Sequence, residues 1–324
     1  MNVRRRVLTA VALGCALTAS AVARAGVTPW VDLEVRDGHV LFAVEVAGHE
    51  GRAIFDTGAQ DNTVSTELVE RAGLKLNGKR FEIVGVVSSD ERVGSVGTLP
   101  VKLFGIDFKL RNVPALPLHH ELIIGAGFLK AGVLQLDYPN RRMRLITPDS
   151  VDLSKAANVP LRLQEGTNLP AIQVTIDGSQ RWMMLDTGNA GPILMRRMVA
   201  SQAGWIERFK RAESAIVDVN AAVSAMDMLV LPSVRIGPFE LEDVPVQIPA
   251  PGEEIRITGA SNSQGRETRV RQGVRISGIV GYEVLRHFVV TLDYDRQLLH
   301  IAPPPEPPAA APAANDTGRE PGER

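Results

Sequence analysis

The chain has 324 residues, of which 44% are hydrophobic and 23% are charged, and its formal net charge is −1. This length can bury two cores of roughly 100–150 residues each, and the balanced charge gives no reason to expect nucleic acid or an anionic membrane surface as a partner. The 29 glycines and 21 prolines favour many short strands and turns over long helices.

The first 25 residues are predicted to be a cleaved signal peptide. Three arginines at positions 4–6 precede an apolar run at 7–19, and Ala23-Arg24-Ala25 supplies a small-x-small cleavage site. We therefore expect a periplasmic or secreted protein of the bacterial cell envelope. Cys15, the only cysteine, lies in this segment, so the mature chain would contain no disulfide and no thiolate metal site.

Two alternatives for this segment stay open. Leu13-Gly14-Cys15 faintly resembles a lipoprotein cleavage box, and an uncleaved anchor is the other alternative, although Ala- and Thr-rich segments of this length span a bilayer weakly. No later segment is long and apolar enough to cross a membrane, so a mature chain starting at Gly26 should have no integral membrane segment.

The β-strand pattern begins at Val31. Alternating or apolar runs such as LFAVEVAG, RAIF, KRFEIVGVV and KLFGIDFKL are separated by turns that contain Gly, Asn-Gly or Asp, which is typical of an all-β chain. One short helix is expected after Ser65, because Ser65 can cap it, Glu67 favours its positive end and Gly73 can end it.

Two apolar strands of the predicted fold end in a carboxylate. Asp56-Thr57-Gly58 follows Ala53-Ile54-Phe55, and Asp186-Thr187-Gly188 follows Met183-Met184-Leu185. An apolar strand does not normally finish in Asp unless the charge is used or paired. Both copies therefore mark candidate functional positions.

The two copies belong to an internal repeat that covers most of the chain. LPVKLFGIDFKLRNVPAL at 99–116 returns as LPSVRIGPFELEDVPVQI at 231–248. IIGAGFLKAGVLQLDYPNRRMRLI at 123–146 returns as IVGYEVLRHFVVTLDYDRQLLHI at 279–301. The matching order in both halves indicates a tandem duplication.

This duplication divides the chain into an N-terminal lobe at 26–148, a linker at 149–157 and a C-terminal lobe at 158–302. The second lobe contains a loop at 249–278 that is much longer than its counterpart. Loops of this length inside compact domains are usually functional or disordered.

The tail at 303–324 is rich in Pro and Ala and lacks apolar bulk, so it is expected to be disordered. It contains a third copy of the tripeptide, Asp316-Thr317-Gly318, which no apolar strand precedes. We interpret this third copy as accidental.

The duplicated motifs resemble those of the aspartic peptidases of the pepsin and retropepsin clan. Each lobe of that family carries Asp-Thr-Gly after an apolar strand, and a later segment of two apolar residues and Gly. Here the downstream segments are Ile123-Ile124-Gly125 and Ile279-Val280-Gly281. Over nearly all of the mature chain, the resemblance implies an all-β fold of two β-barrel-like lobes with a central cleft and few short helices.

The resemblance implies that Asp56 and Asp186 are the catalytic residues. Two carboxylates about 3 Å apart cannot both ionise, so they share one proton. The ionised carboxylate can activate water as a base while the protonated one acts as an acid, which is why the motif is needed twice.

Further residues are implied to support this pair of carboxyl groups. The threonines would lock the two loops together, and the glycines would allow close approach of the backbone. The supporting residues are Thr57, Gly58 and Ala59 in the first lobe, Thr187, Gly188 and Asn189 in the second, and the downstream Gly125 and Gly281.

The family also covers its cleft with a β-hairpin flap, and residues 81–100 lie at the corresponding place. The predicted flap residues are Gly85, Val86, Val87, Ser88 and Gly94, and the segment contains no Tyr, as in the retropepsin kind. Ala59 after the first motif is also retropepsin-like, whereas Asn189 fits neither the pepsin nor the retropepsin pattern.

Other polar residues are interpreted as structural. Asp137 and Asp293 in the repeated LDY segments read as turn or strand-edge residues. His119-His120-Glu121 lacks the i, i+4 spacing of a helical His pair and reads as a polar loop. We predict no metal and no other cofactor.

The leading hypothesis is a secreted, monomeric aspartic endopeptidase whose substrates are polypeptides of the envelope or exported proteins. A non-catalytic binding or scaffold protein with the same bilobal fold is the alternative. A third reading, in which the first lobe pairs with the first lobe of another copy, is made unnecessary by the second Asp-Thr-Gly.

Overall fold

The computed structural model describes residues 26–164, 167–209, 211–257 and 274–304. The predicted signal peptide, the middle of the long loop and nearly all of the tail lie outside the described residues. The strands of the first half are β1 (Val31–Arg36), β2 (His39–Val46), β3 (His49–Asp56), β4 (Thr63–Ser65), β5 (Leu76–Val84), β6 (Ser89–Leu103), β7 (Ile106–Leu116), β8 (Leu122–Gly125), β9 (Val133–Asp137) and β10 (Arg142–Ile146).

The second half contributes a corresponding set of strands. They are β11 (Leu161–Leu163), β12 (Pro170–Ile176), β13 (Ser179–Leu185), β14 (Ile193–Met195), β15 (Arg211–Val217), β16 (Val223–Ile236), β17 (Phe239–Pro249), β18 (Ile276–Val280), β19 (Val289–Asp293) and β20 (Leu298–Ala302). The helices are α1 (Thr66–Arg71), α2 (Arg197–Gln202), α3 (Trp205–Arg208) and α4 (Tyr282–Leu285), with 3₁₀ helices at Ala126–Ala131 and Pro148–Ser150.

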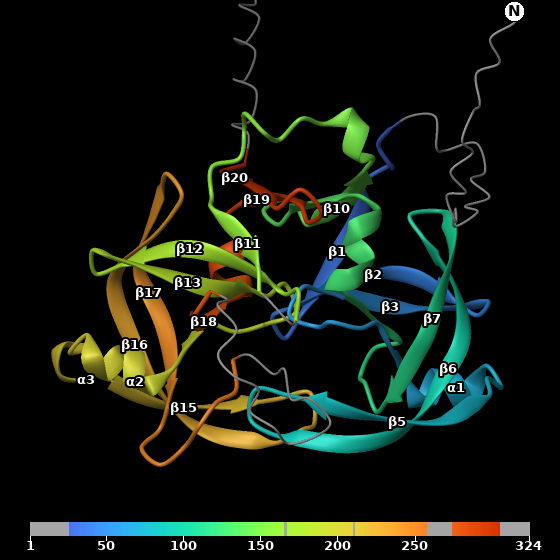
Figure 1. The fold of residues 1–324 in the computed structure, drawn as a ribbon, viewed down its shortest axis with the longest axis horizontal. Helices are drawn as coiled ribbons and strands as arrows, with labels where there is room; N and C mark the ends of the chain where they lie inside the picture. Colours follow the sequence, from blue (N-terminus) through green and yellow to red (C-terminus); the bar gives the residue numbers. More distant parts are fainter. Residues whose placement is uncertain (1–25, 165–166, 210, 258–273, 305–324) are drawn as a thin grey trace, which may run out of the picture.

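The two halves have the same strand order. Neighbouring strands run β1-β2-β3-β8-β4-β7-β6-β5 in the first lobe and β11-β12-β13-β18-β14-β17-β16-β15 in the second. An additional pairing, β2 with β6 and β12 with β16, occurs at the corresponding place in each lobe. Figure 1 shows the blue-to-green first lobe beside the yellow-to-orange second lobe. The predicted all-β fold of two duplicated lobes is confirmed.

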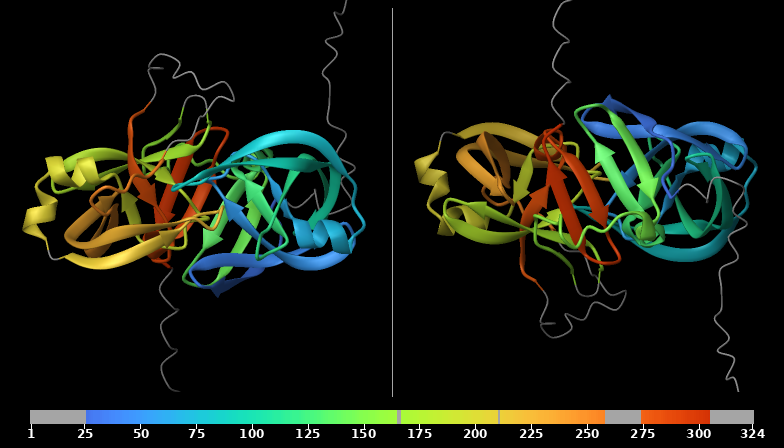
Figure 2. Two further views of the ribbon diagram at one scale, coloured as in Figure 1. Left: turned by 90° about the horizontal axis from the view of Figure 1, so that it is seen from below. Right: turned by 90° about the horizontal axis from the view of Figure 1, so that it is seen from above.

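A further set of strands joins the lobes. The sheet of the first lobe continues from β1 through β10 and β9 to β19 and β20, which come from the end of the chain. Strand β19 pairs antiparallel with β9, and Val290 lies opposite Leu136. Both views of Figure 2 show the red β19–β20 hairpin between the lobes. The last strands of the predicted C-terminal lobe therefore complete a sheet of the first lobe.

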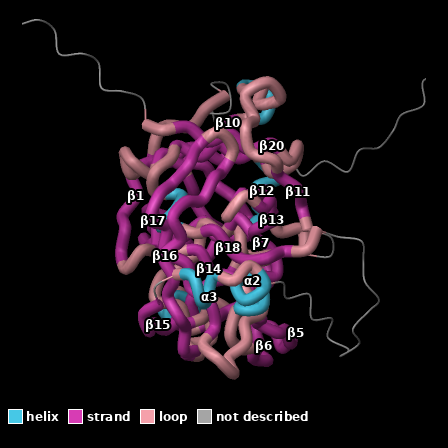
Figure 3. The backbone as a smooth tube through the Cα atoms, turned by 90° about the vertical axis from the view of Figure 1, so that its left-hand side faces the viewer, coloured by secondary structure: helices cyan, strands magenta, loops and turns pink. Residues whose placement is uncertain are grey.

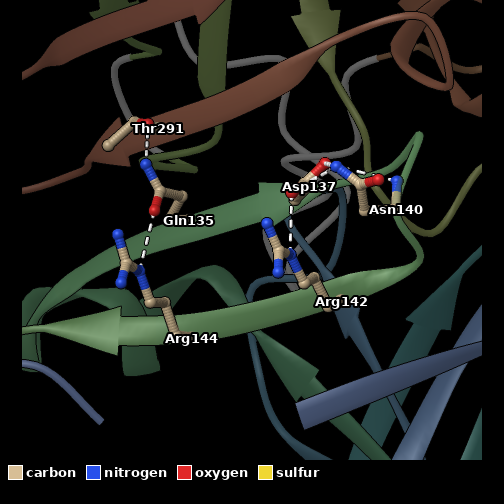
Figure 4. Close-up of polar contacts among 6 residues, drawn as sticks. All are labelled: Gln135, Asp137, Asn140, Arg142, Arg144 and Thr291. Carbon is tan, nitrogen blue, oxygen red and sulfur yellow. Dashed lines mark hydrogen bonds and ion pairs between the residues drawn. The ribbon is translucent and has the colours of Figure 1, made fainter. Parts of the chain in front are cut away.

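Polar side chains reinforce this interlobe sheet, as Figure 4 shows. Gln135 Nε2 donates to Thr291 Oγ1 at 3.0 Å, across the β9–β19 pairing. Arg144 Nε in turn donates to Gln135 Oε1 at 2.8 Å. This chain of hydrogen bonds ties three neighbouring strands, β10, β9 and β19, to one another.

Asp137 and Asp293 end strands β9 and β19 and hold the turns that follow. Asp137 accepts hydrogen bonds from the side-chain amide of Asn140 and from Arg142 Nε at 2.9 Å. Asp293 accepts one from the backbone N–H of Arg296 at 3.0 Å. The prediction that both carboxylates are turn residues is confirmed.

The two faces of β3 pack against different clusters. Phe55 belongs to the main core, where its ring stacks on Phe42 at a centroid distance of 5.1 Å. Ile54 points the other way, into a small separate cluster with Leu41 and Ile123. Because side chains alternate along a strand, Asp56 lies on the face of Ile54 and away from the main core.

Helices are few and short. Helix α1 begins where expected, since Ser65 Oγ accepts a hydrogen bond from the backbone N–H of Leu68 at 3.0 Å. Gly73 follows the helix with φ of 59°, a left-handed conformation that glycine adopts without strain. Figure 3 shows how little of the backbone is helical. None of the helices in the described residues has the length and hydrophobicity needed to cross a membrane.

The predicted linker at 149–157 is attached to the body of the protein. It begins within the 3₁₀ helix at Pro148–Ser150, and the side chain of Leu153 is buried beside Val133 and Ile146. The connection between the lobes is thus partly packed rather than wholly exposed.

Candidate active site

The two Asp-Thr-Gly segments form loops at equivalent positions in the lobes. Asp56 is the last residue of β3, and Asp186 directly follows β13. In Figure 1 these two strands lie between the interlobe sheet, at the top, and strands β5 and β15, near the lower edge. Each loop leaves an apolar strand whose side chains anchor it in the core of its own lobe.

Each carboxylate is held by the backbone of its own loop. Asp56 Oδ1 accepts hydrogen bonds from the N–H groups of Gly58 at 2.8 Å and Ala59 at 3.1 Å. Asp186 Oδ1 accepts the equivalent bonds from Gly188 at 2.9 Å and Asn189 at 3.0 Å. Each carboxyl group is thus held in its loop through one of its two oxygens.

The two threonines cross from one lobe to the other. Thr57 Oγ1 donates to the carbonyl oxygen of Leu185 at 2.5 Å and accepts from the backbone N–H of Thr187 at 3.1 Å. Thr187 Oγ1 donates to the carbonyl oxygen of Phe55 at 2.5 Å and accepts from the backbone N–H of Thr57 at 3.1 Å. Both side chains are buried, so this symmetric lock fixes the relative position of the loops.

The glycines of the loops leave room for the carboxylate of the opposite lobe. A Cβ atom on Gly58 would lie 2.5 Å from Asp186 Oδ2, and one on Gly188 would collide with the carboxyl group of Asp56. Real Cβ contacts are never that short, so any side chain at these positions would push the carboxyl groups away from the loops. The two carboxyl groups are therefore in close contact because both glycines are present.

The downstream glycines lie directly against the loops. A Cβ atom on Gly125 would lie 2.6 Å from the carbonyl oxygen of Asp61, and one on Gly281 would lie equally close to that of Asn189. The residues that follow them bond to the loops, since the backbone N–H of Ala126 donates to Ala59 at 2.8 Å. Both downstream glycines thus pack against the Asp-Thr-Gly loop of their own lobe.

Burial raises the pKa of both carboxyl groups, and the contact between them acts on the two in opposite directions. The pKa of Asp186 is well above its usual range because of burial first, then the negative charge of Asp56 and a hydrogen bond between the two carboxyl groups. Burial also raises the pKa of Asp56, but hydrogen bonds from Asp186, Gly58 and Ala59 oppose this rise. Asp186 is accordingly the better holder of a single shared proton, and Asp56 the better holder of the negative charge.

Asn189, the residue that departs from the family pattern, bonds to Asp186 through its backbone N–H, whereas its side chain bonds within the loop. Its side-chain oxygen accepts from the backbone N–H of Gly191 at 3.0 Å, and its amide nitrogen donates to the carbonyl oxygen of Pro192 at 3.3 Å. The Asn189 side chain is therefore used within its own loop.

Several residues near the site were not predicted from the sequence. The charge of His39, at the start of β2, acts on Asp56 and lowers its pKa. Gln60 Nε2 donates to the carbonyl oxygen of Thr167 at 2.9 Å, a second contact between the lobes. Neither residue lies in a motif, and only the fold brings it to the site.

The predicted flap is a hairpin of β5 and β6 with its tip at 85–88. Gly94 lies in β6 with φ of 115°, close to Leu76 on β5, near an irregularity in the pairing of the two strands. The tip contacts a second hairpin, formed by β15 and β16 of the other lobe, which the sequence analysis missed. The internal repeat could have predicted this second hairpin. When the Leu-Pro dipeptides that begin at residues 99 and 231 are aligned, residues 213–232 correspond to the flap segment at 81–100.

The loop 119–121 has a structural role. Glu121 Oε2 accepts from the backbone N–H of Arg52 at 2.7 Å, and Glu121 Oε1 lies 3.3 Å from the guanidinium of Arg71. Among the described residues, no group of three or more His, Cys, Asp or Glu side chains is arranged to hold a metal ion.

A protein-family model described as aspartyl protease matches residues 42–128 and 172–284, more than half of the chain. Each matched region contains one Asp-Thr-Gly loop and its downstream glycine. A stretch of 104 residues is 31% identical to DNA damage-inducible protein 1 of Kluyveromyces lactis. That stretch is 32% of this chain and 25% of the relative, so the similarity spans a quarter of the relative's length. With two locked Asp-Thr-Gly loops, one inside each matched region, the chain belongs to the aspartyl protease family and is of the retropepsin-like kind.

Proposed function

We propose that this protease is an endopeptidase of the bacterial cell envelope, which hydrolyses exported proteins or the periplasmic domains of membrane proteins. Membership of the family gives peptide-bond hydrolysis in general and a polypeptide as substrate. The basic, apolar and small-residue pattern of the first 25 residues supports export.

The observation that carries the catalytic assignment is the reciprocal threonine lock. It joins loops that are 130 residues apart in sequence and brings Asp56 and Asp186 together. A chain that used these residues only as turn formers would not need to hold two carboxyl groups in contact, because that contact raises the free energy of the ionised forms.

The raised pKa values of the pair suggest how the roles are divided. The Asp56 carboxylate takes a proton from a water molecule, whose oxygen attacks the carbonyl carbon of the scissile peptide. Asp186 gives its proton to the carbonyl oxygen, and the tetrahedral intermediate then forms without a covalent bond to the enzyme. When the C–N bond breaks, Asp56 passes the proton that it took from water to the leaving amine. One hydroxyl of the intermediate becomes the new carbonyl and returns its proton to Asp186, so the pair again holds a single proton.

One chain supplies both half-sites, so we propose that the monomer is the active form. The first lobe does not require the first lobe of a second copy, because Asp186 occupies the position that such a copy would fill. Activity that is proportional to enzyme concentration at nanomolar levels, with a monomeric mass by light scattering, would support this.

The test is incubation of the purified protein with a denatured protein or a peptide library, followed by mass spectrometry. Internal cleavages that disappear in Asp56→Asn support the proposal. A folded wild-type protein that binds peptides without cleaving them would instead make it a binding module.

The place of action is tested separately. The full-length chain expressed in a bacterial host should be recovered from the periplasmic fraction with Gly26 as its first residue. Recovery with the first 25 residues attached, or with a lipid on Cys15, would contradict a cleaved soluble form.

A further inference from the structure

The tips of the two hairpins meet in an asymmetric contact, which we call the hairpin bridge. It consists of residues 83–88 of the first lobe and residues 218–222 and 256 of the second. One oxygen of a single carboxylate, Asp218 Oδ2, accepts three hydrogen bonds from the flap: from the backbone N–H of Val87 at 3.3 Å, the backbone N–H of Ser88 at 2.8 Å and Ser88 Oγ at 2.9 Å.

The other oxygen of Asp218 fixes the turn that carries it. Asp218 Oδ1 accepts from the backbone N–H groups of Asn220 at 2.9 Å and Ala222 at 3.0 Å. Bonds of this kind would be enough for an ordinary turn-forming aspartate. The three bonds of the second oxygen to the opposite lobe go beyond that role.

Two further contacts of the second lobe hold the same flap tip. Asn220 Nδ2 donates to the carbonyl oxygen of Ile83 at 3.3 Å and to Ser88 Oγ at 3.1 Å. The backbone N–H of Arg256 donates to the carbonyl oxygen of Val86 at 2.7 Å. The polar groups at the tip are thus satisfied by the other lobe.

Gly85 makes the close approach of Asp218 feasible. A Cβ atom at this position would overlap Asp218 Oδ2 and lie 3.2 Å from the Cβ of Asp218. The φ of Gly85 is not in the left-handed region, so the absence of a side chain at this position matters for the room that it leaves to the Asp218 carboxylate.

The carboxylate in the bridge is charged. Burial alone would raise the pKa of Asp218, but the hydrogen bonds from Ser88, Ala222 and Asn220 outweigh it and hold the pKa below its usual range. Hydrogen bonds to an ionised acceptor are roughly twice as strong as those between neutral groups.

The bridge and the threonine lock together join the lobes at two levels. The lock joins them at the Asp-Thr-Gly loops, and the bridge joins them at the hairpin tips. A polypeptide can pass between two such connections by threading one of its ends. An internal segment, or a chain without ends, can enter only when one connection opens.

We propose that Asp218 is a positioning residue that holds the two hairpin tips together, so that its hydrogen bonds must break whenever the flap opens to admit an internal segment of a polypeptide. The inference rests on the proposed endopeptidase function. The threonine lock is buried and fixes the catalytic carboxyl groups, so the bridge is the connection that can open without dismantling the site.

A reversible covalent lock tests the opening step. A Cβ atom at position 85 would lie 3.2 Å from the Cβ of Asp218, near the Cβ–Cβ separation of about 3.5–4.5 Å in disulfides, so the variant Gly85→Cys/Asp218→Cys, in a Cys15→Ser background, can close the bridge with a disulfide. We expect the oxidised form to cleave a head-to-tail cyclic peptide roughly tenfold or more slowly than the reduced form, with recovery on reduction. The single-cysteine variants are the controls and should not respond to reductant.

Equal rates in the oxidised and reduced forms would overturn the proposal. If the reduced form and the wild type both fail to cleave any peptide, the proposed function fails instead. Amide hydrogen exchange at the flap tip needs no catalysis, so it tests the role of Asp218 even if the proposed endopeptidase function fails.

Exchange at the N–H groups of Val87 and Ser88 should be faster in Asp218→Ala by about 10–100-fold, since charge-assisted hydrogen bonds are lost. Asp218→Asn keeps one acceptor oxygen and should recover part of the protection. Asp107→Ala, which changes an exposed carboxylate of the first lobe, should leave exchange at both amides unchanged. Unchanged exchange in Asp218→Ala would show that Asp218 does not hold the flap.

Discussion

The two lobes agree closely around the Asp-Thr-Gly loops and differ at the hairpin tips. Around the carboxyl groups, each hydrogen bond of the first lobe has an equivalent of similar length in the second. At the tips, the carboxylate of Asp218 in the second lobe accepts three hydrogen bonds from the first lobe, while Asn220 and Arg256 donate to carbonyl oxygens of the first lobe. Sharing one proton requires two equivalent half-sites, whereas closing the hairpins requires two complementary ones. The duplicated halves therefore retain symmetry where the chemistry needs it.

The largest effect is expected from breaking the symmetry of the carboxyl groups. Asp56→Asn and Asp186→Asn should each lower kcat/KM by on the order of 10²–10⁴-fold, because each removes either the base or the acid of a shared pair. Both variants should keep the wild-type melting temperature or exceed it at neutral pH, since each replaces a carboxyl group whose ionisation burial disfavours by a neutral amide. Steady-state kinetics and calorimetry on the same preparations check this. Near-normal activity in Asp186→Asn would mean that the second lobe does not contribute an intramolecular partner.

The threonine lock offers a second test of the symmetry. Thr57→Val and Thr187→Val are similar in shape, and each leaves a buried backbone N–H and a carbonyl oxygen without their partner. Each should lower the free energy of unfolding by about 1–3 kcal/mol, by equal amounts in the two lobes. The double variant should cost less than the sum of the two, because the side chains form one network. Urea denaturation measures all four proteins, and a clear inequality between the single variants would show that the lobes are not held symmetrically.

The pH dependence of activity tests the effect of Ala59 and Asn189, the residues that directly follow Asp-Thr-Gly in the first and second lobes. Activity should fall on the acid side as Asp56 gains a proton and on the alkaline side as Asp186 loses one, with both limits raised by burial. The Ala59 side chain cannot donate a hydrogen bond to the ionised pair, and that of Asn189 is used within its own loop. We expect a maximum of kcat/KM at about pH 4.5–6.5, which is higher than the midpoint of the two pKa values, about 1.5 and 4.7, of the carboxyl pair in pepsin.

Ala59→Thr restores a hydroxyl donor and should lower the pH of the maximum by roughly one unit. A pH–rate profile of the two proteins decides this. A wild-type maximum near pH 2–3, or an unchanged maximum in Ala59→Thr, would refute this account of the site.

The smallest effect is expected at the third copy of the motif. Asp316 has the same tripeptide as the two lobes but no apolar strand before it, so Asp316→Asn should change neither kcat/KM nor the melting temperature. The variant is also the matched control for Asp56→Asn and Asp186→Asn. A measurable loss of activity would mean that the tail contacts the site.

The sequence predicted the repeated part of the molecule well. Apolar runs ending in Asp56 and Asp186, with Gly125 and Gly281 downstream, were enough to place the loops and their supporting residues. These features are local and occur once in each lobe, so it is improbable that both copies arose by chance. Helix α1 was also predictable, because Ser65 and Gly73 carry their signals in the sequence itself.

The contacts between the lobes were not predictable in the same way. The partners of Asp218 lie 130 residues or more away, and nothing in a turn such as Val217–Ala222 says which loop will face it. The same holds for His39 and for Gln60 with Thr167. Such pairs depend on the relative position of the lobes, which is set by the threonine lock and the interlobe sheet rather than by local pattern.

The interlobe sheet has a consequence for how the protein folds. Strand β9 is complete early in the chain, but its partner β19 comes about 150 residues later, almost at the end of the described chain. Until β19 arrives, the backbone N–H and C=O groups along one edge of β9 are unpaired, and such an edge can recruit strands from other chains. Pairing over so long a separation has a high loop-closure entropy and slows the search for the native state. A first lobe released without the β19–β20 hairpin would therefore be an aggregation-prone intermediate, because strands that follow the second lobe in the chain complete the sheet of the first.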